Sequence, residues 1–256
     1  MIANEPWTLA GDAPVATIAR QGFVHLAPAQ LCALAGVDID ALEALRPSWD
    51  RLLPDGYLKD GGRYRCRRHS CFVHEPASGR LTQAPHRAHW QPLDYNALHG
   101  GIERMFEPVE PAVAAAPAWH KLLAALGRLF ADVAPAERWF IEAHQFRIDT
   151  TDGVGRPTPE GAHRDGVDFV AVVLVARHHL RGGETRVFQA DGPQGIRFVM
   201  REPWSAVLLD DLRMIHEATP IQPDGDAAHR DTLVLTYRRN GFQSPDSDLA
   251  GSPSRG

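Results

Sequence analysis

The spacing of hydrophobic residues changes near residue 135, and the two halves of the chain predict different structures. In the first half, the clearest pattern predicts a helix over Ala118–Val133, with apolar residues at i, i+3 and i+4 intervals and Pro117 favourable at its start. This helix is expected to brace one face of a sheet. Weaker patterns predict a strand at 22–26 and short helices at 29–35, 40–53 and 102–106.

From residue 136 to residue 240, short apolar segments alternate with turns that contain glycine and proline. This arrangement is typical of short β-strands joined by turns. About eight such segments favour a mainly β fold with flanking helices, whose core is a double-stranded β-helix of the jelly-roll, cupin-like type. The predicted strands cover 139–148, 162–165, 168–176, 185–189, 196–200, 206–210, 214–221 and 232–238.

We therefore expect a single domain over residues 1–240. Within it, residues 1–135 would supply helices that brace the sheet, and residues 136–240 would form the β-rich core. The remaining segment, 241–256, consists largely of Ser, Asp, Gly and Pro, which predicts a flexible tail.

A basic, strand-like segment runs from Tyr57 to Val73 and places Arg63, Arg65 and Arg67 on one side of the strand. We favour the interpretation that this side is solvated. The alternative is that one of these arginines binds a substrate carboxylate, because a guanidinium can do so through two parallel hydrogen bonds.

Composition and charge restrict the classes of partner. The chain of 256 residues has a net charge of −5, which predicts no binding to nucleic acid or to an anionic membrane surface. Its apolar runs are too short for a transmembrane helix, and the N-terminus lacks the pattern of a signal peptide. Three cysteines are too few and too irregular for a disulfide framework, so we expect a reduced, cytoplasmic compartment.

Candidate chemistry is concentrated in the segment Glu160–Asp168. His163 and Asp165 are two residues apart, and in an extended backbone such residues project from the same face. A second histidine, His216, follows much later in the chain. Two histidines and one carboxylate bind one face of Fe(II) and leave positions open for a cosubstrate and O2.

The tripeptide His-Arg-Asp occurs twice, at 163–165 and at 229–231. It also opens the catalytic loop of protein kinases, but the asparagine required five residues after the aspartate is here Val170. Only the first copy has a later histidine that could complete a metal site. We therefore predict that His163, Asp165 and His216 bind the metal, which leaves Arg230 of the second copy for another role.

This order of residues resembles the Fe(II)/2-oxoglutarate-dependent dioxygenases. In that superfamily an arginine follows the distal histidine and, with a hydroxyl two residues on, holds the distal carboxylate of 2-oxoglutarate; Arg230 and Thr232 match this element. The resemblance implies Fe(II), 2-oxoglutarate and O2 as cofactor and cosubstrates, with succinate and CO2 as products. The amino-acid sequence of five segments is similar to the bacterial branch that hydroxylates free L-amino acids, typified by L-isoleucine dioxygenase. These segments are 64–70, 95–106, 159–170, 182–185 and 216–221.

The resemblance further implies a free, aliphatic L-amino acid as substrate, such as isoleucine, leucine or methionine, with sulfoxidation or desaturation as other outcomes of the same chemistry. Two alternatives stay open: an amino acid that is carrier-bound or embedded in a peptide, and a non-catalytic metal-binding β-barrel. A homodimer is a further hypothesis. His144 is interpreted as a buried supporting residue and not as a ligand. The candidates for substrate contacts are Arg65, Arg67, Gln145, Arg147, Glu160, Arg164 and Asp168.

Overall fold

The computed structural model of the chain describes residues 7–9, 11, 13–95, 98 and 100–245. Among these residues, no helix combines the length and the apolar character needed to cross a bilayer. The helices are α1 (Pro14–Gln21), α2 (Pro28–Ala35), α3 (Ile39–Glu43), the 3-10 helix η1 (Arg46–Arg51), α4 (Pro111–Ala114) and α5 (Pro117–Val133). The strands are β1 (Phe23–Leu26), β2 (Leu53–Pro54), β3 (Arg65–Glu75), β4 (Arg80–Gln83), β5 (Trp139–Asp149), β6 (Phe169–His178), β7 (Leu180–Gly182), β8 (Thr185–Gln189), β9 (Gly195–Phe198), β10 (Ala206–Asp210), β11 (Met214–Ala218), β12 (Ile221–Pro223) and β13 (His229–Arg238).

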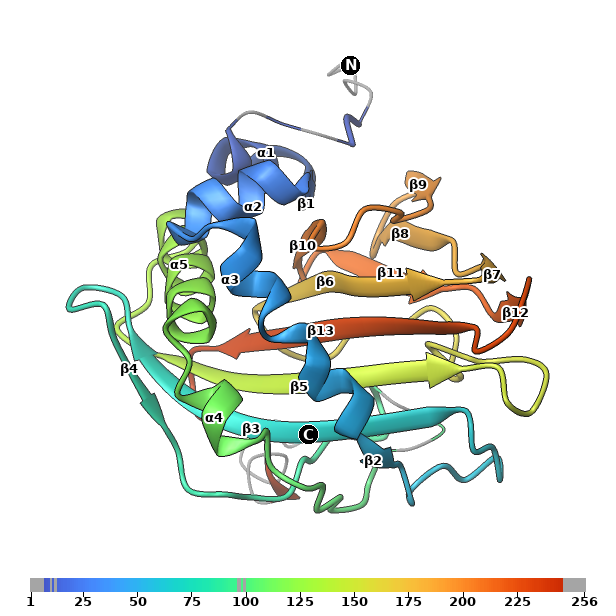
Figure 1. Cartoon of the computed structure of the whole chain (residues 1–256). Helices are drawn as coiled ribbons and strands as arrows, with labels where there is room; N and C mark the ends of the chain where they lie inside the picture. Colours follow the sequence, from blue (N-terminus) through green and yellow to red (C-terminus); the bar gives the residue numbers. More distant parts are fainter. Residues whose placement is uncertain (1–6, 10, 12, 96–97, 99, 246–256) are drawn as a thin grey trace, which may run out of the picture.

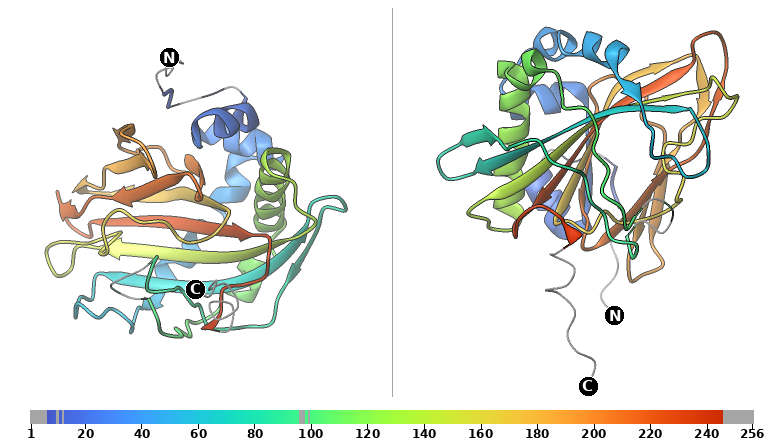
Figure 2. Two further views of the ribbon diagram at one scale, coloured as in Figure 1. Left: turned by 180° about the vertical axis from the view of Figure 1, so that it is seen from behind. Right: turned by 90° about the horizontal axis from the view of Figure 1, so that it is seen from below.

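An eight-stranded antiparallel sheet dominates the fold, in the order β1-β10-β6-β13-β5-β3-β2, with β4 paired to β3. Two smaller sheets, β11-β8-β9 and β12-β7, complete the strand set of the described residues. Helices α1, α2, α3 and α5 gather on one side of the large sheet (Figure 1), and the views from behind and below show the smaller sheets away from them (Figure 2). The predicted mainly β architecture, a jelly-roll core with flanking helices, is confirmed.

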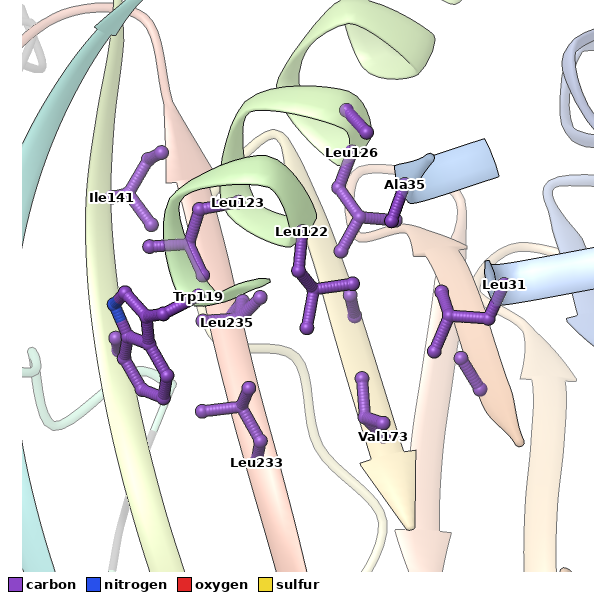
Figure 3. Close-up of a cluster of buried hydrophobic side chains, with 14 of the residues drawn as sticks. Leu31, Ala35, Trp119, Leu122, Leu123, Leu126, Ile141, Val173, Leu233 and Leu235 are labelled. Carbon is purple, nitrogen blue, oxygen red and sulfur yellow. The ribbon is translucent and has the colours of Figure 1, made fainter. Parts of the chain in front are cut away.

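Helix α5 braces the large sheet, as its apolar pattern predicts. Its buried face contributes Trp119, Leu122, Leu123 and Leu126 to the main hydrophobic core. Figure 3 shows these side chains directed at residues of β5, β6 and β13, with α2 closing the cluster from the other side. Full burial of each such side chain contributes roughly 1.5–3 kcal/mol relative to exposure. The sheet residues labelled in this cluster are Ile141, Val173, Leu233 and Leu235.

The large sheet has two buried faces, and this arrangement positions the rest of the molecule's chemistry. On β13, Leu233, Leu235 and Tyr237 enter the helix-covered core. Because side chains alternate along a strand, Thr232 and Val234 point to the opposite face, where they line a cavity. The neighbouring strands β5 and β3 are held in register with β13, so their alternate residues face the same cavity.

Several local predictions differ from the structure. Residues 102–106 do not form a helix; Arg104 instead makes an antiparallel bridge with His89. A five-residue helix is marginal by itself, so backbone pairing with a distant segment prevails. The predicted strand at 162–165 is reduced to a single bridge between His163 and His216. The predicted strand at 214–221 is two strands, β11 and β12, which belong to different sheets.

The first 135 residues supply strands as well as bracing helices, and β1 and β3 fall in the segments predicted as strand or strand-like. This part of the chain contributes β1, β2, β3 and β4 to the large sheet. At the other end, residues 246–256 of the predicted flexible tail lie outside the described residues. The first part of that tail is packed: Gln243 is buried, because its amide hydrogen bonds to backbone carbonyl groups of the 165–166 turn.

Candidate active site

A cavity of about 140 Å³ lies on the face of the large sheet opposite the main core. That volume accommodates roughly ten water-sized positions, so it suits small molecules. Strands β3, β5, β6 and β13 form one wall, and β8 and β11 lie across from them. The lining residues used below are Arg65, Arg67, His89, Gln91, Arg104, Glu142, His144, Glu160, His163, Asp165, Thr185, His216, Arg230, Thr232 and Gln243.

His163, Asp165 and His216 come together at this cavity, as their spacing predicts. One potential ligand atom from each residue lies within 4.8 Å of the others. Asp165 Oδ1 is 3.8 Å from His163 Nε2, and Asp165 Oδ2 is 3.7 Å from His216 Nε2. The backbone bridge between His163 and His216 fixes their relative position, with N–O distances of 3.1 and 2.9 Å.

The hydrogen bonds of these residues suit metal binding. His163 Nδ1 donates to the Gly161 carbonyl at 2.9 Å, so its Nε2 carries the free lone pair. Burial, followed by the neighbouring His163, lowers the pKa of His216 well below its usual range and keeps its imidazole neutral. Burial opposes charging of His163 as well, but Asp165 and Glu160 raise its pKa overall.

The turn that carries Asp165 is held by a buried carboxylate. Asp211 accepts hydrogen bonds from the backbone N–H groups of Asp165, Gly166 and Val167, at 3.0, 2.8 and 3.1 Å. Burial and the charge of Asp165 raise the pKa of Asp211 to about 7, against the lowering effect of these donors. Gly166 has a φ of 75°, and a Cβ there would come within 2.5 Å of Tyr95, so the turn needs glycine.

Arg230 projects into the same cavity from β13. It is buried, and its guanidinium has no hydrogen bond or ion pair with any residue that the structure describes. Burial, together with the charge of Arg177, lowers its pKa to about 10, so it remains a cation at neutral pH. Thr232 follows on the same strand face, and the buried Thr185 hydroxyl nearby on the cavity wall has no partner within the described part of the chain. These groups fit a small carboxylate ligand.

Arg65 and Arg67 are not on a solvated face, which corrects the favoured sequence interpretation. Both are buried because β3 turns this side toward the cavity, whereas Arg63 precedes the strand and is exposed. Arg65 is paired with the buried Asp55 at 2.7 Å. Arg67 is stacked between the rings of Phe106 and Phe146, with its guanidinium carbon 3.8 and 4.4 Å from their centroids.

Gln145 and Arg147 do not line the cavity, contrary to prediction. They occupy the other face of β5: Gln145 donates to Ser48 at 2.8 Å, and Arg147 is bonded to Asp231 at 2.7 and 2.8 Å. A shift of one residue along a strand exchanges the two faces. The cavity side of β5 is therefore formed by Glu142, His144 and their alternate neighbours.

The predicted substrate-contact residues near the turn that carries Asp165 separate into two groups. Glu160 lines the cavity, and its Oε1 atom lies 3.6 Å from His163 Nε2. Arg164 points away from the cavity; it donates to the Leu212 carbonyl at 3.2 Å. Asp168 also lies outside the cavity and is paired with Arg239 at 2.6 Å, so it fastens the end of β13. Neither Arg164 nor Asp168 therefore lies at the cavity where we predicted substrate contacts.

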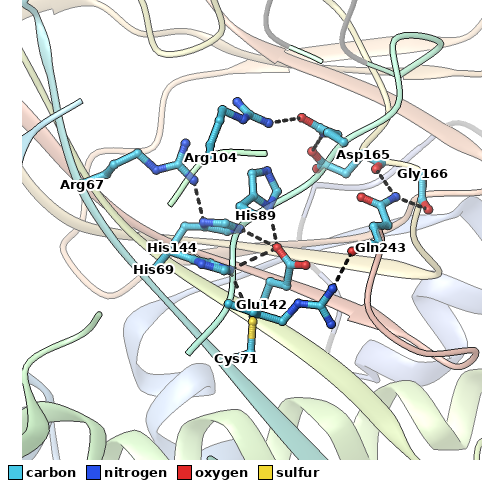
Figure 4. Close-up of polar contacts among 12 residues, drawn as sticks. Arg67, His69, Cys71, His89, Arg104, Glu142, His144, Asp165, Gly166 and Gln243 are labelled. Carbon is cyan, nitrogen blue, oxygen red and sulfur yellow. Dashed lines mark hydrogen bonds and ion pairs between the residues drawn. The ribbon is translucent and has the colours of Figure 1, made fainter. Parts of the chain in front are cut away.

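Several cavity residues were not among the predicted site residues, including His89, Gln91, Arg104, Glu142 and His144. His69, Glu142 and His144 are buried on the paired strands β3 and β5, and His89 and Arg104 are bridged to each other in the loop that follows β4 (Figure 4). The alternation of Glu142 and His144 along β5 was the available signal. His144 is buried, as we expected.

Comparisons with known proteins agree with this geometry. The family model described as 2OG-Fe dioxygenase matches residues 46–236. A crystal structure of a bsmA homolog from Methylobium petroleophilum PM1 is 56% identical, with a TM-score of 0.88, and the match covers 93% of this chain and 96% of that chain. No curated protein gave a match.

Two more distant structures are similar in fold. IDO from Bacillus thuringiensis is 16% identical, with a TM-score of 0.72 over 92% of this chain and 100% of that chain. The Fe(II)/(alpha)ketoglutarate-dependent dioxygenase TqaL is 18% identical, with a TM-score of 0.67 over 88% and 85%. The family match spans most of the chain, and the cavity holds a two-histidine, one-carboxylate group. The chain therefore belongs to the 2OG-Fe dioxygenase family and is a 2-oxoglutarate-dependent non-haem iron dioxygenase that uses Fe(II), 2-oxoglutarate and O2.

Proposed function

We propose that His163, Asp165 and His216 hold the iron and that Arg230 and Thr232 hold the distal carboxylate of 2-oxoglutarate. The observation that carries this proposal is the buried Arg230 guanidinium, which lacks a protein partner in the described residues and shares one cavity with the three ligands. A buried charge without a partner is costly, so a ligand of opposite charge is the natural complement.

When bound, iron and 2-oxoglutarate supply the oxidising chemistry that places an oxygen atom from O2 on a C–H bond, with release of succinate and CO2. The protein residues position and shield these groups. Gln91 donates to Asp165 Oδ1 at 3.0 Å, which orients that carboxylate. Burial of the site limits the access of water to the reacting groups.

The proposed substrate is a free, aliphatic L-amino acid, which is hydroxylated on its side chain. Two observations support this choice. The cavity is small, and the sequence around His163, Asp165 and His216 is similar to that of the amino acid hydroxylase branch. A small zwitterion needs a cation and an anion beside the iron, and the cavity wall contains both kinds of group.

Substrate-dependent succinate formation tests this function. Each of the twenty amino acids would be incubated with the iron-loaded protein, 2-oxoglutarate and O2. We expect an aliphatic amino acid to give succinate and an equal amount of a product heavier by one oxygen atom. Turnover of a carrier-bound or peptide-embedded amino acid, together with none of any free amino acid, would refute the proposed substrate class.

We expect Asp211 to act as a positioning residue for the turn at 165–167, which carries the proposed iron ligand Asp165. Asp211→Ala removes the acceptor of three backbone N–H groups, so the turn should loosen and iron affinity should fall by about 10- to 100-fold. The measurement is iron titration without 2-oxoglutarate. Asp210→Ala is the matched control, since Asp210 bonds to the neighbouring Leu212 and Arg213 backbone and to none of these N–H groups. Equal iron affinity in both variants would exclude the role.

A further inference from the structure

A second polar cluster lies in the same cavity, beside the metal residues, and the proposed iron and 2-oxoglutarate contacts do not use it. It is built around Glu142, whose Oε2 atom lies 2.5 Å from His89 Nδ1, 3.2 Å from His69 Nε2 and 3.6 Å from His144 Nε2 (Figure 4). All four side chains are buried. Burial of a carboxylate costs free energy unless a cation or hydrogen-bond donors compensate its charge, so this cluster is expected to bind a partner.

The hydrogen bond from Arg67 determines the protonation of one histidine. Arg67 Nη2 is 2.7 Å from His144 Nδ1, and a guanidinium only donates hydrogen bonds. His144 Nδ1 must therefore accept, and its proton lies on Nε2, toward Glu142. The Nε2–H group of this imidazole then faces Glu142 Oε2 at 3.6 Å.

The remaining protonation states follow from burial. Burial lowers the pKa of His69 and of His144, and it lowers that of His89 to about 3, in each case against the effect of Glu142. Burial would raise the pKa of Glu142, but His89 and the hydrogen bonds from the imidazoles hold it well below its usual range. Glu142 is thus an anion whose neighbours in the cluster are neutral, and its Oε1 atom has no hydrogen bond with a described residue.

A positive charge faces the same part of the cavity without an ion pair. Arg104 is buried, and no carboxylate of the described residues lies within 4.0 Å of its guanidinium nitrogens. Its one hydrogen bond, to Gln91 Oε1, is long at 3.4 Å, and its Nε atom is buried without a partner in the described chain. Arg104 is bridged through its backbone to His89, which contacts Glu142, so the cation and the anion are close but do not touch each other.

We infer that Glu142 and Arg104 bind the ammonium and carboxylate groups of the amino acid substrate, an inference that rests on the proposed function. The cavity contains two buried guanidinium groups without an ion pair, Arg230 and Arg104. The proposed cosubstrate occupies the first, and a second anionic group is needed for the other. An α-amino acid supplies that anion together with a cation for Glu142. The hydrogen bond from Arg104 to Gln91, and from Gln91 to Asp165, places this pair beside the iron ligands.

A metal ion is the main competing occupant, because three histidines and a glutamate are a plausible ligand set. The contact with Arg67 disfavours it. A metal on His144 Nε2 would move the proton to Nδ1, where it would oppose the Arg67 donor. In addition, His69 Nδ1 is buried without the hydrogen-bond acceptor that usually orients a metal-binding histidine.

Glu142→Gln tests the ammonium contact, because it removes the charge and keeps the shape. With the amino acid found in the screen, we expect the apparent constant for that substrate to rise tens- to thousands-fold, as for the loss of a buried charge pair. The apparent constant for 2-oxoglutarate and the affinity for iron should be unchanged. A merely structural role would alter all three. Glu184→Gln is the control, since Glu184 is paired with Arg186 outside this cluster.

Substrate analogues give the specific readout. Wild-type protein should bind the amino acid more tightly than the corresponding 2-hydroxy acid, which lacks the ammonium group, and Glu142→Gln should erase most of that difference. Arg104→Gln should in the same way reduce the preference for the amino acid over its amide. This second variant keeps the inference testable if Glu142→Gln does not fold.

Three results would overturn the inference. Unchanged selectivity in the folded variants would remove Glu142 and Arg104 from the substrate site while leaving the proposed function intact. Absence of turnover with every free amino acid would refute both this inference and the proposed function. A third result concerns the metal: if His163→Ala/His216→Ala protein still bound one Zn²⁺ or Fe²⁺ tightly, and Glu142→Gln abolished that binding, the cluster would be a metal site.

Discussion

Replacement of His216 with alanine is expected to abolish iron-dependent turnover while the protein remains folded. His216 is one of only three groups proposed to hold the iron, and its side chain is buried beside Asp165. Its loss should weaken iron binding by more than about 100-fold, the upper end of the cost of losing a residue that merely supports a ligand. Iron titration and succinate formation measure the two effects, and thermal unfolding checks the fold.

The chain offers a matched control in the second His-Arg-Asp tripeptide. His229 begins β13, its Nδ1 donates a hydrogen bond to the Ala227 carbonyl group at 2.7 Å, and its side chain does not line the cavity. His229→Ala should therefore retain iron affinity and turnover near the wild-type level. Normal activity in His216→Ala, or loss of iron binding in His229→Ala, would show that the wrong histidine was chosen.

The close approach of His163, Asp165 and His216 was predictable because the requirement for a metal site is local and restrictive. His163 and Asp165 are separated by one residue. Only this first His-Arg-Asp copy is followed by a histidine far enough along the sequence, His216, to complete the site; no histidine follows His229 in the sequence. The jelly-roll class was also predictable, since short apolar segments between turns recur through 136–240. Neither inference requires knowledge of which distant segments pair.

The faces of β5 were not predictable from the residue pattern. Both faces are buried, one against the helices and one toward the cavity, and both carry a mixture of apolar and polar residues. The usual alternation of apolar and polar residues, which tells the inner face of a strand from the outer one, is therefore absent. Gln145 and Arg147 were chosen for their chemistry, although Glu142 and His144 lie on the cavity side.

Which of the buried arginines has an ion-pair partner could not be predicted from the sequence, for a related reason. Arg65 and Arg104 are both buried cations in the same wall, but Arg65 has a carboxylate partner in Asp55, whereas Arg104 has none among the described residues. That difference depends on where His89 and Arg104, which are far from β5 in the sequence, come to lie against it. Composition and spacing contain no information about it, so Arg104 became a candidate only through the structure.

Arg230→Ala is expected to raise the apparent constant for 2-oxoglutarate by tens- to thousands-fold. The reason is that the distal carboxylate would lose its charge partner in a buried pocket, a cost on the order of 2–5 kcal/mol. Each ~1.4 kcal/mol is a factor of ten in the constant. Arg230→Lys should also be impaired, since lysine keeps the charge but loses the planar guanidinium that binds a carboxylate through two hydrogen bonds. The measurement is the 2-oxoglutarate dependence of succinate formation.

The Arg230 variants should separate cosubstrate binding from metal binding. Arg230 acts on 2-oxoglutarate and not on the iron, so iron affinity without 2-oxoglutarate should stay near the wild-type value. Arg238→Ala is the control: Arg238 is on the same strand face and lines the same cavity, but its guanidinium is already bonded to the Gly241 carbonyl at 3.1 Å. We expect only a mild change there. Unaltered 2-oxoglutarate dependence at position 230, together with a large loss at position 238, would transfer the carboxylate-binding role to the second arginine.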